Sequence, residues 1–245
     1  AAALREECHV DYLVDNGFLE LVNDTGYRCT PFGSLVARLY VYPTSAVLVK
    51  RRLLERVAEA APGPFEPWFF TLARDVQEAQ NSTYAPSLFH AAWHWMEEAS
   101  MDLVLEPARE PIPALKAVIP ASDDPVYPGD FSTFKADLQR WARAAARIAG
   151  HLGMAALADE CSRLERRVEH GVRAELLPLV ENLKGVGRIR GRMLFRAGCT
   201  SIEAVQDADP EALARATGLP AQACERIINS AREWQPVEEQ ESDDG

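Results

Sequence analysis

The C-terminal part of this chain takes its fold from one stretch, Leu183-Lys184-Gly185-Val186-Gly187-Arg188-Ile189-Arg190-Gly191-Arg192-Met193-Leu194-Phe195-Arg196-Ala197-Gly198. The stretch predicts a helix that ends near Leu183, a tight turn with glycines at positions 185 and 187, and a second helix that Gly198 ends. Val186 is expected to point into the core. The small Gly191 lets the two helices cross closely, and Leu194 anchors their apolar side. This pattern is typical of a helix-hairpin-helix.

The turn of this stretch is a candidate binding site for an anion. Free peptide N–H groups at the start of the second helix, together with the helix dipole, favour a negative group such as a nucleic-acid phosphate. Such a contact fixes position without reading a base, and it weakens as salt rises. An ordinary pair of antiparallel helices with a glycine turn is the alternative interpretation. The predicted site consists of the turn, Gly185, Val186 and Gly187, and of a basic collar around it, Lys184, Arg188, Arg190 and Arg192.

The overall charge is unusual for a nucleic-acid-binding protein, because the net charge is −11. The distribution of charge matters more than the sum. Between Arg163 and Arg196 the chain has nine basic and four acidic residues, a local charge of +5. The chain is 47% hydrophobic, which is ample for a folded core. The acidic tail over residues 235–245 is expected to be disordered.

The N-terminal part is predicted to contain the one departure from helical structure. A helix over Leu4–Asn16 precedes two β-type runs, which the turn Asn23-Asp24-Thr25-Gly26 joins as a hairpin. Thr30 then caps another helix that has Pro31 at its first position. Helix, hairpin and helix in this order are typical of the end of a winged-helix domain. The two β-type runs are Phe18–Val22 and Tyr27–Thr30.

Proline-rich breaks divide the rest of the chain into further helices, so the predicted fold class is mainly α. A second and weaker hairpin begins at the capping residue Asp209 and turns at Thr217-Gly218-Leu219; with one glycine and no basic collar, it is expected to be structural. We expect a winged-helix remainder over 1–61, a helical bundle over 62–165, a helix-hairpin-helix domain over 166–234 and the tail over 235–245. The predicted helical stretches between the breaks are Pro67–Gln80, Pro86–Ser100, Asp130–Leu152, Ala155–Gly171 and Val172–Asn182.

The sequence predicts no catalytic residue and no metal site. It has no Gly-x-x-x-x-Gly-Lys-[Ser/Thr] phosphate loop and no nucleophile elbow. His90 and His94 are one helical turn apart, but Ala91 stands where the metalloprotease pattern has Glu, so this stripe is expected to be core. Five scattered cysteines are typical of reduced thiols in a cytoplasmic protein. No apolar run approaches the roughly 20 residues that span a bilayer, so no membrane partner is expected.

Three stretches together resemble the C-terminal half of the archaeal Ski2-type DNA-repair helicases of superfamily 2. Thr30-Pro31-Phe32-Gly33 is similar to the exit of the family's winged helix, and Pro128-Gly129-Asp130-Phe131 is similar to the start of its ratchet helix. The most specific match is Val168-Glu169-His170-Gly171-Val172, followed by the hairpin described above. The resemblance covers the whole chain except the tail. It implies a winged-helix end, a helical ratchet domain and a helix-hairpin-helix domain.

The resemblance also implies functional roles. Two motor domains would lie upstream and hold ATP and Mg²⁺, while this chain holds no cofactor. A tryptophan of the ratchet helix, here Trp141, would stack on bases of the translocating strand, although the residues alone favour a packing role for it. The family's second ratchet contact is an arginine two turns earlier, where this chain has Phe134 and Lys135, so Lys135 is the candidate. The family's Arg-Ala-Arg motif grips the emerging strand, and here it reads Arg190-Gly191-Arg192.

These observations predict a protein that binds single-stranded or forked DNA as part of an ATP-dependent 3′–5′ DNA helicase. Two alternatives stay open. One is a protein-interaction module, because related modules of spliceosomal helicases serve protein partners. The other is a stand-alone structure-specific DNA-binding protein.

Overall fold

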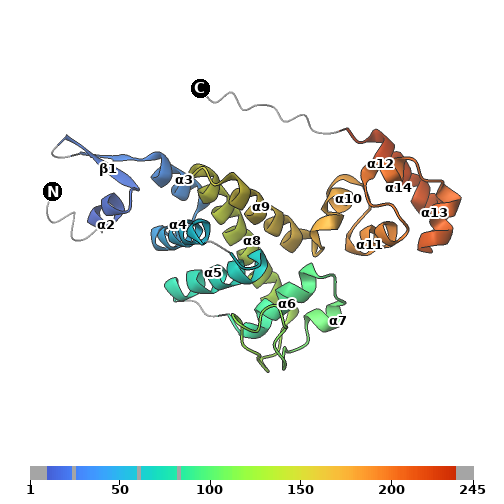
Figure 1. Ribbon diagram of the computed structural model, residues 1–245, viewed down its shortest axis with the longest axis horizontal. Coiled ribbons are helices and arrows are strands. Elements are labelled where there is room, and N and C mark those ends of the chain that lie inside the picture. Colours follow the sequence, from blue (N-terminus) through green and yellow to red (C-terminus); the bar gives the residue numbers. More distant parts are fainter. Residues whose placement is uncertain (1–9, 24–25, 60–61, 82–83, 236–245) are drawn as a thin grey trace. The chain divides into compact units, whose positions relative to one another are not determined.

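The computed structural model describes residues 10–23, 26–59, 62–81 and 84–235, and the fold is mainly α, as the sequence predicts (Figure 1). Contacts divide the chain into two compact units. The first unit runs to Trp95 and resumes over Ala99–Glu169, and the second consists of Met96–Glu98 and the chain from His170 onward. The predicted domain boundaries stay predictions. The predicted acidic tail, apart from Gln235, and the start of the predicted first helix lie outside the described residues.

The first unit begins with the predicted order of helix, hairpin and helix. Helix α2 (Val10–Asp15) precedes strands β1 (Leu19–Val22) and β2 (Gly26–Cys29), which pair antiparallel with Leu19 opposite Cys29. Helix α3 (Pro31–Leu39) follows, and the Thr30 hydroxyl accepts a 2.9 Å hydrogen bond from the Gly33 N–H group. Gly33 is required here because an added Cβ would lie 2.1 Å from the Phe18 carbonyl oxygen.

Helix α3 ends at Tyr40, which has a left-handed backbone (φ 53°), and α4 (Pro43–Ala58) starts three residues later. The proline at the first position of α4 is favourable because its missing N–H has no partner in a first helical turn. No single helix in the described part of the chain has the length and apolarity that crossing a membrane requires. Helices α3 and α4 meet that test only as a pair, and the chain bends by 112° between them.

The body of the first unit is a bundle in which α4 contacts both α5 (Phe65–Ala79) and α8 (Pro128–His151) (Figure 1). Helix α8 buries alanines in its C-terminal half, and small residues allow neighbouring helices to approach closely. At its N-terminal half the Phe134 ring packs edge to face against the Phe89 ring, with centroids 4.8 Å apart. The remaining helices of the unit are α6 (Pro86–Met96), α7 (Met101–Val104) and α9 (Ala155–His170).

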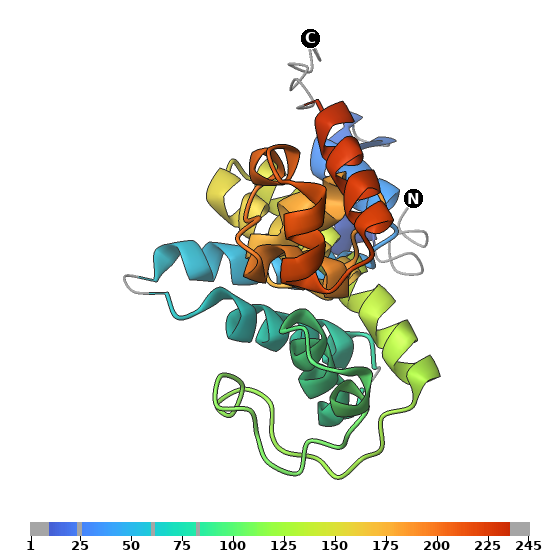
Figure 2. The ribbon, with the colours of Figure 1, turned by 90° about the vertical axis from the view of Figure 1, so that its right-hand side faces the viewer.

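A long irregular loop, residues 105–127, joins α7 to α8 and is visible as the green to yellow-green segment in Figure 2. It is held against the bundle although it has no regular structure. The side chains of Leu115 and Ile119 are fully buried, and Arg74 Nη1 donates a 2.6 Å hydrogen bond to the Val118 carbonyl oxygen. The prolines at which the sequence predicts breaks between helices therefore lie in a connector that packs against the bundle.

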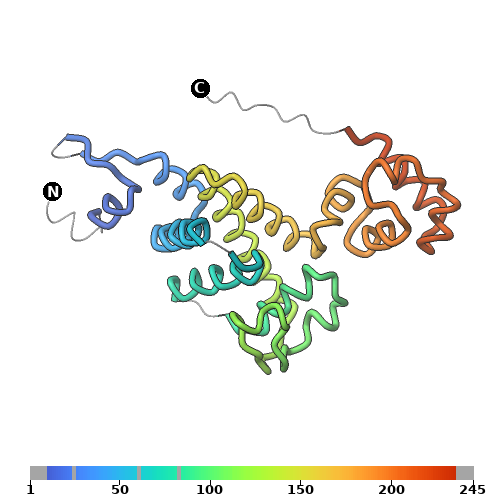
Figure 3. The backbone as a smooth tube through the Cα atoms, in the orientation of Figure 1, coloured from blue at the N-terminus to red at the C-terminus, as the bar shows by residue number. Residues whose placement is uncertain are grey.

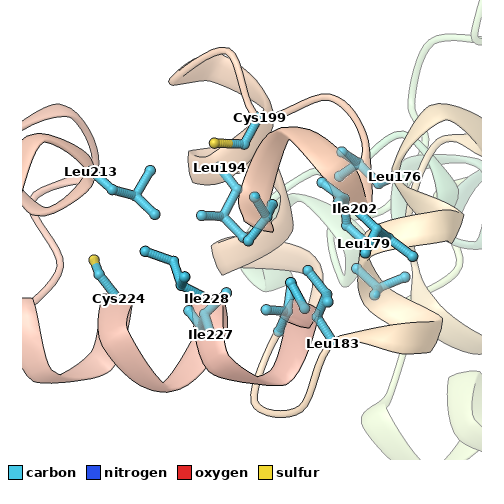
Figure 4. Close-up of a cluster of buried hydrophobic side chains, with 14 of the residues drawn as sticks. Leu176, Leu179, Leu183, Leu194, Cys199, Ile202, Leu213, Cys224, Ile227 and Ile228 are labelled. Carbon is cyan, nitrogen blue, oxygen red and sulfur yellow. The ribbon is translucent and has the colours of Figure 1, made fainter. Parts of the chain in front are cut away.

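The second unit consists of short helices joined by tight turns (Figure 3). Its core is one apolar cluster in which Leu194 of α11 lies between Leu213 on one side and Ile202 on the other (Figure 4). Both predicted hairpins contribute to this cluster, so they fold as a single body. The helices are η2 (Ala174–Leu176), α10 (Leu177–Asn182), α11 (Arg188–Arg196), α12 (Ile202–Gln206), α13 (Pro210–Thr217) and α14 (Ala221–Glu233).

Candidate nucleic-acid interface

The bend between α10 and α11 has the helix, turn and helix that the sequence predicts. Leu183 closes α10 with its side chain buried, and its carbonyl oxygen accepts a 3.1 Å hydrogen bond from the Val186 N–H group. Gly185 has φ +77°, a conformation that costs a residue with a side chain roughly 1–2 kcal/mol. Val186 is 5% exposed, while Gly185 and Gly187 are exposed on either side of it. The buried valine thus holds two exposed glycines at the surface.

The start of α11 has no side-chain cap. Gly187 is the capping residue, its carbonyl oxygen accepts a 2.8 Å hydrogen bond from the Gly191 N–H group, and no side chain caps the first turn. The first N–H groups of a helix have no partner within the helix, and they lie at the positive end of its dipole. Among the residues of the bend, Gly187 therefore marks a position that favours an anion.

Two basic side chains lie at this bend. The side chain of Lys184 is 86% exposed, and its backbone N–H donates a 2.9 Å hydrogen bond to Ser230 Oγ of α14. Arg190 is exposed and folds back, so that its Nη1 donates a 2.7 Å hydrogen bond to the Gly185 carbonyl oxygen. That bond uses one of the five N–H donors of the guanidinium group. Among the described residues Arg190 has no acidic partner, so its charge stays at the bend without a counter-ion.

Arg192 is placed differently from Arg190, although the sequence puts both in one basic collar. Its guanidinium group pairs with Glu98 and Glu175 at 2.7 Å each, and its side chain is 19% exposed. The hydrogen bonds that Arg192 donates to these carboxylates raise its pKa. Burial raises the pKa of Glu98, but hydrogen bonds from Arg192 and from the Arg173 N–H group outweigh burial and leave that pKa below its usual value. Arg192 is thus engaged in an ion cluster.

Arg188, the first residue of α11, is also partly buried. Burial lowers the pKa of its guanidinium group, and the nearby Glu98 carboxylate partly opposes that effect. The predicted basic collar therefore divides into two pairs. Lys184 and Arg190 are exposed at the bend, whereas Arg188 and Arg192 lie on the side that faces Glu98.

A groove of about 600 Å³ opens beside the bend, and sequence reasoning missed half of it. Lys184, Gly185 and Arg190 line one wall, and α14 supplies the other. The sequence interpretation gave the second hairpin a structural role because it has a single glycine and no basic collar. One sequence signal could have indicated this wall. The lining residues of α14 recur every three or four positions, so they share one face of the helix. The lining residues of α14 are Ala223, Arg226, Ile227, Asn229, Ser230 and Glu233.

Trp141 and Lys135 belong to the first unit, on α8, while the other predicted site residues belong to the second. Trp141 is 4% exposed, and its ring packs edge to face on Phe134 and Tyr84, with centroids 6.4 and 6.5 Å apart. This is the packing role that the residues alone favour. Lys135 Nζ lies 4.9 Å from the centroid of the Trp95 ring. Their DNA contacts, which the family resemblance implies, stay predictions.

The two histidines of α6 lie within the bundle. His90 is 1% exposed, and its Nε2 is 3.0 Å from the Pro120 carbonyl oxygen. Burial lowers the pKa of both His90 and His94, which favours their neutral forms. Within the described residues, no group of three or more His, Cys, Asp and Glu side chains is arranged to hold a metal ion.

Both hairpins lie within the match to a single family model. Residues 177–233 match the family model described as a SAM-like helix-hairpin-helix tandem, so the match includes the bend and α14. The chain is also similar to curated helicases. Along 89% of its length it is 30% identical to the ATP-dependent DNA helicase Hel308 of Pyrococcus abyssi, and along 91% it is 29% identical to Hel308 of Pyrobaculum calidifontis.

A shorter region is more similar. Over 103 residues, 39% of this chain, identity to Hel308 of Aeropyrum pernix reaches 42%, and the match covers 14% of that protein. The chain spans about a third of the length of the curated relatives it matches, 32% for those of Pyrococcus abyssi and Pyrobaculum calidifontis. These findings confirm the resemblance to a DNA-helicase family that the sequence predicts.

Proposed function

Since this chain is homologous to about a third of the length of the Hel308 DNA helicases, we propose that it is a DNA-binding part of a helicase of that kind. We assign the contact to the bend Lys184–Gly187 and to Arg190. The exposed bend itself carries this proposal: an uncapped helix start, two exposed glycines and two basic side chains lie together. A phosphate group meets backbone N–H donors and positive charge at the same place.

The proposed contact does not depend on base sequence. Backbone N–H groups, lysine and arginine at this bend would bind the phosphodiester chain, which every strand shares. Such binding suits a strand that must slide through a protein, because each phosphate offers the same contact as the one before it. We therefore propose that the unit grips single-stranded or forked DNA during 3′–5′ unwinding.

Force generation is assigned to motor domains outside this chain. Those domains would bind ATP together with Mg²⁺, and ATP hydrolysis would supply the free energy for each step of translocation. The sequence of this chain has no phosphate loop, and the described residues offer no acidic cluster for a metal ion. We propose that the role of this chain is to hold the strand between steps.

A salt titration with a matched control tests the proposal. The double variant Lys184→Ala/Arg190→Ala removes both exposed cations of the bend. The control Lys116→Ala/Arg215→Ala removes the same charges from two exposed positions that do not line the groove. Fluorescence anisotropy with a labelled fork and a labelled single strand should show binding at least about tenfold weaker for the bend variant at low salt. The slope of log Kd against log salt should fall by roughly 1.4 on single strand.

The control decides what a loss means. Equal losses in both double variants would indicate a general effect of net charge and would remove the bend from the proposal. Unchanged binding in the bend variant would favour a module that serves a protein partner.

A further inference from the structure

Basic side chains lie on both walls of the groove beside the bend. Lys184 and Arg190 lie on the wall formed by the bend, and Arg226 lies on the wall formed by α14. Glu233 is the one acidic residue among those that line the groove. Its carboxylate lies 3.7 Å from Lys184 Nζ, and both side chains are more than 70% exposed, so water and salt screen this pair strongly. Three basic residues against one acidic residue give the lining of the groove a net positive charge.

Arg226 differs from the other arginines of its hairpin. Arg215 of α13 lies 3.9 Å from the Glu211 carboxylate, and Arg232 of α14 donates a 3.2 Å hydrogen bond to the Gln206 carbonyl oxygen. Arg226 is exposed and has neither an ion pair nor a side-chain hydrogen bond to any residue in the described part of the chain. Arg226 lines the groove, and the N–H donors of its guanidinium group have no acceptor among the described residues. Positive charge in a concave surface raises the local concentration of anions.

The two walls are fixed relative to each other. Ser230 of α14 is 8% exposed and accepts the hydrogen bond from the Lys184 N–H group, which ties the bend to α14. One turn earlier on α14, Ile227 is 2% exposed and packs in the same core cluster as Leu183 and Val186. Because the groove is held open by core packing, an anion that enters it meets donors that are already in place.

We propose that this groove is a phosphate-binding position of the strand, and that Arg226 is its contact on the wall opposite the bend. The inference rests on the proposed function, since it adds a second wall to the same site. A phosphate has several acceptor oxygens, so the Lys184 and Arg190 side chains on one wall and the planar guanidinium fork of Arg226 on the other can engage it from two sides. The amide of Asn229, which lines the same wall, supplies a further donor.

The proposal gives the second hairpin a function in DNA binding. Its own turn has no basic collar, but its last helix completes the site of the first hairpin. The family match over residues 177–233 spans both walls of this groove. We therefore expect that the tandem, rather than either hairpin alone, is the binding unit.

Single substitutions in the full chain test the inference. Arg226→Ala should weaken binding to a labelled single strand about tenfold at low salt and lower the salt slope by roughly 0.7. Arg226→Lys keeps the charge but loses the planar fork, so it should fall between the wild type and Arg226→Ala. Glu233→Gln should strengthen binding about two- to fivefold, because it removes the opposing charge. Arg215→Ala is the control for loss of one exposed arginine in the same hairpin.

The outcomes separate this inference from the proposed function. If Arg190→Ala weakens binding while Arg226→Ala behaves like Arg215→Ala, the proposed contact of Arg226 is wrong and the proposed contact at the bend is supported. If neither Arg190→Ala nor Arg226→Ala differs from the control, the proposed function itself fails. A melting curve for each variant should match the wild type, since these side chains are exposed, and a lowered melting temperature in Arg226→Ala would assign its effect to folding.

Discussion

The two hairpins of the second unit have the same spacing of turn and core residues, but they differ in the polar groups around the turn. Gly185 and Gly218 occupy equivalent positions, and both have a left-handed backbone, with φ +77° and +73°. Counting onward from these glycines, Leu194 of the first hairpin corresponds to Ile227 of the second, and both are buried in the shared core. The backbone course of each hairpin thus follows from the same few positions, whatever the hairpin binds.

The turns differ in the donors that they can offer to an anion. Gly187, which caps α11, corresponds to Pro220, which precedes α14 and has no N–H group. In the second turn, Thr217 Oγ1 also accepts a hydrogen bond from the Leu219 N–H group at 3.3 Å. A helix-hairpin-helix thus has two properties that can vary separately. Core positions fix the bend, and donors around the bend give it affinity for phosphate.

The largest effect on stability is expected where α10 and α11 cross. Gly191 of the first hairpin corresponds to the buried Cys224 of the second, so the two crossings tolerate different volumes. A Cβ at Gly191 would already lie 2.9 Å from Val180 Cγ1. Gly191→Leu should therefore destabilise the second unit by about 3 kcal/mol through overpacking. Native-state hydrogen exchange of the α11 and α14 amides would measure the loss.

The volume-reducing change Cys224→Ala is the counterpart for Gly191→Leu. It should cost no more than about 1–2 kcal/mol, since it removes a single buried sulfur. Equal exchange rates for Gly191→Leu and the wild type would show that α10 and α11 do not cross as closely as the structure has them.

A smaller effect on stability is expected for the ion cluster of Arg192 with Glu98 and Glu175. Arg192 corresponds to Glu225, an exposed residue of the second hairpin, so the cluster belongs to the first hairpin alone. The pKa of Glu98 is lowered in the folded protein, so the stabilisation that it provides is present above its ordinary value near 4.5. That stabilisation is lost as the pH falls through the lower, folded-state pKa. Urea unfolding as a function of pH would follow this loss.

Glu98→Gln separates folding from binding. It should cost about 2 kcal/mol at neutral pH and should remove this part of the acid dependence, because glutamine has no charge to lose. DNA binding at neutral pH should be unchanged, since Arg192 is engaged in the cluster and does not line the groove. Weaker DNA binding in a folded Glu98→Gln protein would instead indicate that the cluster positions the bend.

The sequence predicted the helices and turns of the first hairpin more readily than it predicted which donors are exposed at the bend. The first hairpin could be predicted from its glycine spacing and from Val186 and Leu194, because these residues act through local backbone geometry and burial. Likewise the Thr30 cap and the β1–β2 hairpin follow from turn chemistry near them in the chain. Each of these features depends on residues a few positions apart.

The environment of the charged residues could not be predicted in the same way. Arg190 and Arg192 are two positions apart in one motif, yet one lies at the bend and the other pairs with Glu98, which is far away in the sequence. Arg226 lines the groove because α14 folds back beside the bend, and nothing within a few positions of it indicates that. Long-range packing decides which charges of a basic stretch are exposed, and a single sequence contains no record of that packing.

The smallest effect on stability gives the sharpest difference between the hairpins. Gly185→Ala and Gly218→Ala both place a side chain on a left-handed backbone, so each should cost about 1 kcal/mol in unfolding experiments. Their effects on DNA binding should differ. At Gly185 the new Cβ would lie 3.5 Å from Arg190 Nη1, beside the proposed phosphate position, whereas a Cβ at Gly218 meets no atom within 4 Å.

We expect Gly185→Ala to weaken binding to a single strand about three- to tenfold and Gly218→Ala to leave it unchanged, as anisotropy titrations would measure. Equal stability losses make the pair a matched control, because any difference in affinity then arises from the bend and not from the fold. If the two variants lost affinity equally, the hairpins would be equivalent in binding, and the donors at Gly187 and Arg190 would not explain the difference between them. If Gly218→Ala alone lost affinity, the phosphate position would belong to the second turn.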